Sequence, residues 1–123
     1  MMNEIVTLKM PFRFGKVFFR EKNVDFIFRI GTLEDALDNY LNCSFEEIST
    51  RNPQDVLMSL LFAGYITACQ KRYRKPKYNF NHAFFWVNNM NKESNELFLK
   101  AINDLFGKYK KEEKIEDTEE KKK

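Results

Sequence analysis

The stretch that decides the fold is residues 52–71, which read NPQDVLMSLLFAGYITACQK. Asn52 offers a side-chain oxygen to the free amides of a first helical turn, and Pro53 suits the first helical position. Asp55 adds a negative charge near the positive end of the helix dipole. We therefore predict a long helix over 53–72.

This helix is apolar on two faces rather than one. Leu57, Leu60, Leu61, Gly64, Tyr65 and Ala68 share the first face, and Phe62, Ile66 and Cys69 share the second. A helix that is apolar nearly all round is either central to its own fold or half covered by a partner. Its apolar run is shorter than the roughly 20 residues that cross a bilayer, so we expect a protein without a membrane span.

Three further helices flank the long one, at about 33–42, 81–88 and 93–106. The first carries an apolar stripe at helical spacing, and we expect the Thr32 hydroxyl to cap it. Ser44 and Glu47 have the spacing of a capping box and predict a short helical turn. Gly107 is the expected end of the last helix.

The first 30 residues are instead typical of β-structure. Phe and Val dominate residues 16–30, so we predict a hairpin there with its turn at 21–23. From Lys108 onward lysine and acidic residues dominate, and we expect a charged, disordered, flexible tail over 108–123. The predicted fold class is α+β, mainly α-helical, with a single globular domain over 1–107.

Composition restricts the chemistry. The 123 residues contain 4 Gly, 2 Cys and 1 His, too few for a glycine-rich phosphate loop or a closed zinc site. Cys43 and Cys69 are interpreted as small hydrophobes in a reducing cytosol, and His82 as a capping or partly exposed residue. We expect no enzyme activity, no metal and no cofactor.

The order of these elements resembles the tail assembly chaperones of long-tailed bacteriophages. The residues that carry the resemblance are Gly31-Thr-Leu-Glu-Asp-Ala-Leu37, as a helix start, and Leu57-Met-Ser-Leu-Leu-Phe-Ala-Gly-Tyr65, as an apolar helix with a small residue and an aromatic near its end. The resemblance covers about residues 16–107. It implies a binding protein of the bacterial host cytoplasm that keeps the apolar helices of a tape measure protein soluble during tail assembly.

An amphipathic helix of such a client would dock on the second face of the long helix and on the aromatic helix that follows. The predicted partner-binding residues are Phe62, Tyr65, Ile66, Phe85 and Trp86. The aromatic run that contains Phe85 and Trp86 is more typical of a protein core than of a binding pocket.

A cationic segment follows the long helix. Its positive side chains are Lys71, Arg72, Arg74, Lys75 and Lys77, interleaved with Tyr73 and Tyr78. Three interpretations stay open: a solvated loop, a nucleic-acid-binding loop of a small regulatory protein, or a contact with the acidic side chains at 34, 35 and 38 of a neighbouring copy. The last would produce self-association.

Overall fold

The computed structural model describes residues 5–14 and 18–122, and the predicted fold class is confirmed: an N-terminal hairpin is followed by four α-helices. The hairpin pairs β1 (Ile5–Phe14) with β2 (Phe18–Ile27). The helices are α1 (Ile30–Ala36), α2 (Pro53–Lys71), α3 (Phe80–Asn89) and α4 (Lys92–Lys122). A π-helical turn, η1 (Leu37–Leu41), extends α1, and a 3-10 turn, η2 (Glu46–Thr50), precedes α2.

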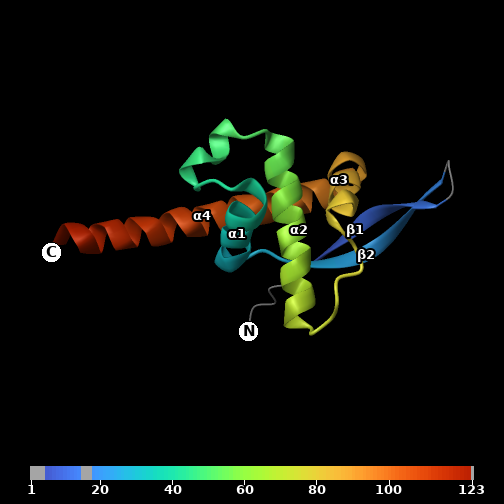
Figure 1. Cartoon of the computed structure of the whole chain (residues 1–123), viewed down its shortest axis with the longest axis horizontal. Helices are drawn as coiled ribbons and strands as arrows, with labels where there is room; N and C mark the ends of the chain where they lie inside the picture. Colours follow the sequence, from blue (N-terminus) through green and yellow to red (C-terminus); the bar gives the residue numbers. More distant parts are fainter. Residues whose placement is uncertain (1–4, 15–17, 123) are drawn as a thin grey trace.

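Helix α2 stands at the centre of the molecule. In Figure 1, α1 lies on one side of it and the hairpin with α3 on the other, while α4 passes behind and extends beyond the other helices. Asn52 caps α2 as predicted, because its Oδ1 accepts a hydrogen bond of 2.8 Å from the Gln54 amide. The first apolar face of α2 is largely buried, whereas the second face, with Phe62, Ile66 and Cys69, is half-buried, so most of the apolar surface of α2 belongs to the core of the chain itself.

The hairpin lies earlier in the chain than predicted. Its antiparallel register pairs Ile5 with Ile27 and Leu8 with Val24, and residues 21–23 lie inside β2 instead of forming the turn. Leu8, Met10, Val24 and Phe26 are buried, so one face of the ribbon packs on the helices. Burial of that face outweighs the local turn preference of 21–23. Residues 16 and 17, at the start of the predicted hairpin, lie outside the described residues.

Thr32 does not cap α1 as predicted. The helix begins two residues earlier, at Ile30, and the Thr32 hydroxyl is buried. It donates a hydrogen bond of 2.9 Å to the carbonyl of Ile27 at the end of β2, and lies 3.1 Å from the hydroxyl of Thr67 on α2. Thr32 therefore ties the hairpin, α1 and α2 together.

Helix α4 continues past Gly107, where we expected it to end, and residues 108–122 are helical where a flexible tail was expected. A glycine inside a helix costs only about 1 kcal/mol relative to alanine, and the lysine and glutamate residues that follow are good helix formers. Residue 123 lies outside the described residues. None of the described helices has the length and apolar character to cross a membrane.

Candidate functional site

Two of the five predicted partner-binding residues lie in the core. Trp86 has no exposed surface and Tyr65 is 6% exposed. The indole of Trp86 meets the rings of Phe26 and Tyr65 edge to face, each with a centroid distance of 5.9 Å. The prediction that these two residues bind a partner is corrected: they join α2, α3 and the hairpin inside the chain itself.

The other three residues are half-buried and do not form one surface. Phe62 and Ile66 are one turn apart on the outer face of α2. Phe85 lies on α3, where the guanidinium of Arg13 from β1 is 5.8 Å from its ring centroid. The structure therefore brings Phe62 and Ile66 together and leaves Phe85 with the hairpin.

An aromatic cluster at the surface contains Phe62 and two rings that sequence reasoning did not include among the site residues. Tyr40 from η1, Phe62 from α2 and Phe80 from α3 are all half-buried, and their ring centroids lie 5.5 to 5.6 Å apart. We call these three residues the surface aromatic cluster. Burial, helped by the carboxylate of Asp35, raises the pKa of Tyr40 above its ordinary value of 10.0.

Apolar surface continues from this cluster along α3. Phe84 follows Phe80 by one helical turn and is 51% exposed. Farther along the same pair of helices, the side-chain amide of Gln54 donates a 2.5 Å hydrogen bond to Asn88 Oδ1 and joins α2 to α3. Phe62, Phe80 and Phe84 therefore follow the seam between two antiparallel helices.

The cationic segment leaves α2 and returns to α3 as a loop whose basic side chains are all exposed. Tyr65 on α2 anchors this loop to the core, because its Oη accepts hydrogen bonds from the backbone amides of Lys77, at 2.7 Å, and Tyr78, at 3.3 Å. The amide of Arg74 donates to the carbonyl of Cys69 at 2.9 Å. The loop is thus held in a defined path, with Tyr73 at a left-handed φ of 55° and 97% exposed.

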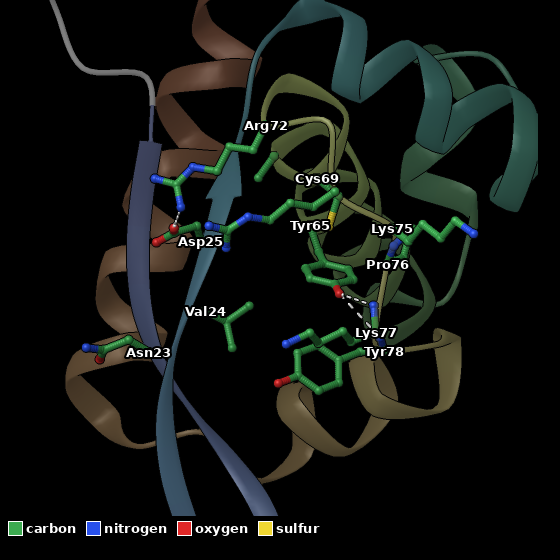
Figure 2. A pocket seen from close by; sticks show the side chains of 12 residues that line it. Asn23, Val24, Asp25, Tyr65, Cys69, Arg72, Lys75, Pro76, Lys77 and Tyr78 are labelled. Atoms are coloured by element: carbon green, nitrogen blue, oxygen red, sulfur yellow. Dashed lines mark hydrogen bonds and ion pairs between the residues drawn. The ribbon is translucent and has the colours of Figure 1, made fainter.

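A cavity of about 610 Å³ opens between this loop and β2, as Figure 2 shows. The residues that line it come from β2, the end of α2 and the loop. They are Asn23, Val24, Asp25, Tyr65, Ala68, Cys69, Arg72, Arg74, Lys75, Pro76, Lys77 and Tyr78. The cationic residues of this lining were predicted, whereas the contribution of β2 was not, because the contact between β2 and the loop joins residues far apart in the chain.

The charges of this lining are strongly unbalanced. Asp25 is the single carboxylate among the lining residues, and it forms an ion pair of 2.5 Å with Arg72. Asp25 also accepts a 2.6 Å hydrogen bond from the Thr7 hydroxyl on β1. Among the described side chains, those of residues 5–13 and 20–111, no acidic group pairs with Arg74, Lys75 or Lys77. The cavity therefore presents a positive wall.

The remaining candidate residues are His82, Cys43 and Cys69, and their contacts do not form a catalytic or metal-binding arrangement among the described residues. His82 completes the capping box of α3, whose N-cap is Asn79: its amide donates to Asn79 Oδ1 at 3.2 Å, and its Nδ1 accepts from the Asn79 amide at 3.1 Å. Cys43 and Cys69 are free thiols and half-buried. In the part of the chain that the structure describes, no three histidine, cysteine or acidic side chains gather as metal ligands.

Comparisons with protein-family models, curated proteins and solved structures found no match to this chain.

Proposed function

We propose that this protein is a tail assembly chaperone of a bacteriophage or prophage, acting in the bacterial host cytoplasm without a catalytic step. Its client would be the tape measure protein, whose apolar helical segments it would bind and keep soluble. The observation that supports this proposal is the surface aromatic cluster, Tyr40, Phe62 and Phe80, which leaves three large rings from three elements partly exposed side by side.

Such a cluster suits an apolar helix for a physical reason. Amphipathic helices dock into apolar grooves through side chains spaced three or four residues apart, and aromatic rings supply much of the binding energy at interfaces. Ile66 extends the cluster along α2, and Phe84 extends it along α3. The seam between α2 and α3 thus offers aromatic and aliphatic contacts over several helical turns.

Co-expression tests this proposal. The chain would be expressed together with the tape measure protein of the same genome, and the soluble fraction of the client would be measured. We expect the unmodified chain to keep the client soluble. We expect Phe62→Asp with Ile66→Asp to lower the soluble fraction at least about fivefold, because carboxylates on this surface would need to be desolvated on binding.

Controls separate loss of binding from loss of folding. Leu97→Asp with Leu99→Asp makes the same chemical change on exposed positions of α4 and should leave the client soluble. Phe84→Asp, at a more exposed ring, provides a milder variant of the proposed surface, and circular dichroism reports whether each variant folds. The proposal fails if folded variants of Phe62, Ile66 and Phe84 still keep the client soluble.

A further inference from the structure

We propose that the cavity between β2 and the loop after α2 binds a nucleoside phosphate group, either a free nucleotide or one unit of a single-stranded nucleic acid. This inference is independent of the chaperone function, because the cavity and the surface aromatic cluster share no residue. Four features of the cavity support it: its size, its charge, its fixed shape and the aromatic rings beside it.

The size and the charge of the cavity together favour a phosphate that is attached to a larger organic group. At about 610 Å³ the cavity lies within the range of about 300 to 1,000 Å³ that is usual for small-molecule sites. Arg72 is neutralised by Asp25, whereas Arg74, Lys75 and Lys77 have no acidic partner within the described ranges. A phosphate would supply the missing negative charge, and Arg74 could contact it through two parallel N–H groups.

The loop holds these cations in place before any ligand binds. Tyr65 Oη accepts hydrogen bonds from two consecutive loop amides, and Pro76 restricts the backbone next to them. The ring of Tyr78 packs against Tyr65, with a centroid distance of 5.4 Å, and against Trp86, at 5.5 Å. Since both ends of the cationic stretch are attached to the core, binding would order few additional residues.

The aromatic rings favour a nucleotide over a simple carboxylate. Tyr65 and Tyr78 form part of the cavity wall in Figure 2, and Tyr73 stands on the same loop with its ring almost fully exposed. Bases stack on exposed rings such as that of Tyr73, whereas an acidic peptide gains nothing comparable from such a ring. Cations interleaved with tyrosine are typical of surfaces that follow a single strand.

Fluorescence anisotropy with a labelled oligothymidylate of about 12 nucleotides tests the proposal directly. We expect binding that weakens about 20-fold between about 50 and 200 mM salt, as neutralisation of about three phosphates on a single strand predicts. Unlabelled thymidine monophosphate in competition identifies the source of the ligand: effective competition indicates a free nucleotide, and poor competition indicates a strand. Both results support the nucleoside phosphate site.

Variants locate the site. Arg74→Gln, Lys75→Gln and Lys77→Gln together should weaken binding at least about tenfold, and Tyr73→Ala at least about fivefold. The matched control, Lys92→Gln, Lys100→Gln and Lys108→Gln on α4, removes the same charge from exposed positions and should change the affinity less than about twofold. Each variant would first be shown to fold by circular dichroism.

Three results would overturn the proposal. The first is an absence of oligothymidylate binding at the lower salt concentration. The second is an equal loss of affinity in the loop variant and the α4 control, which would indicate a net-charge effect. The third is evidence that the loop binds acidic side chains instead, such as those of Glu34, Asp35 and Asp38 in a second copy. Tighter binding of polyglutamate than of oligothymidylate, or loop-dependent dimers by light scattering at low salt, would provide it.

Discussion

Gly64 on α2 faces the ring of Phe28 so closely that a β-carbon at this position would overlap the ring, approaching Cδ1 to 2.9 Å. The ring cannot easily retreat, because it stacks on Phe26, with a centroid distance of 5.8 Å, and contacts Phe98 at 5.6 Å. The small residue in the Ala-Gly-Tyr end of the apolar helix is thus explained by the packing of the segment after β2.

Substitution of this glycine should therefore destabilise the fold. We expect Gly64→Ala to lower the free energy of unfolding by about 1–2 kcal/mol, since overpacking costs about 1–3 kcal/mol and the gain in helix propensity offsets up to about 1 kcal/mol. Gly107→Ala on α4 is the matched control. Nothing lies within 4 Å of a β-carbon there, so this change should stabilise by up to about 1 kcal/mol. Urea denaturation measures both; equal effects would contradict the overlap.

Two threonines in contact should differ in their contribution to stability. Thr32 donates to the carbonyl of Ile27, whereas Thr67 donates at 2.8 Å to the carbonyl of Ala63, one turn earlier in its own helix. We expect Thr32→Val to cost about 1–3 kcal/mol, because the buried Ile27 carbonyl loses a donor. Thr67→Val should cost less, because the Ala63 carbonyl still accepts a backbone hydrogen bond within α2. Thermal unfolding of both variants tests the order, and a larger loss for Thr67→Val would refute it.

Stability should decline in alkaline solution because of two tyrosines. Burial raises the pKa of both Tyr65 and Tyr40 above the ordinary value of 10.0. In the unfolded chain these hydroxyls ionise near pH 10, whereas in the folded chain they ionise only at higher pH. Their contribution is therefore complete below pH 10 and is lost as the pH rises through the folded pKa.

Urea denaturation at neutral pH and above pH 10 measures this dependence. Tyr40→Phe and Tyr65→Phe should each make stability less sensitive to alkaline pH. At neutral pH, Tyr65→Phe should also be the less stable of the two, because the amides of Lys77 and Tyr78 lose their acceptor. An unchanged alkaline slope in both variants would show that these hydroxyls do not cause the decline.

Glu47 should titrate below the ordinary glutamate range. Its Oε1 accepts hydrogen bonds from the amide of Ser44, at 3.2 Å, and from the Ser44 hydroxyl, at 3.0 Å, and these bonds lower the pKa of its carboxyl. The stabilisation is present above the unfolded pKa and is lost as the pH falls through the folded value. Carboxyl titration by NMR should show this lowered pKa and its partial return in Ser44→Ala. An identical titration curve in the variant would disprove the assignment.

Local signals in the sequence predicted the helices well where the determining interactions are close along the chain. Asn52 and Pro53 mark the start of α2 because capping depends on the next two or three residues only. The same reasoning located the short turn at Ser44 and Glu47, whereas the capping box between Asn79 and His82 was not predicted as such. The positive charge of the loop could also be predicted, because it follows from the residue types alone and needs no tertiary contact.

The sequence by itself thus determined a helical protein with an N-terminal hairpin, a central apolar helix and a cationic loop. Only the tertiary structure decided which side of that helix is covered, and it placed Tyr65 and Trp86 inside. It also decided the hairpin register, which brings Asp25 to the cavity and Thr32 to the carbonyl of Ile27. The physical reason is that burial depends on contacts between residues far apart in the chain, which the local periodicity of an all-round apolar helix does not specify.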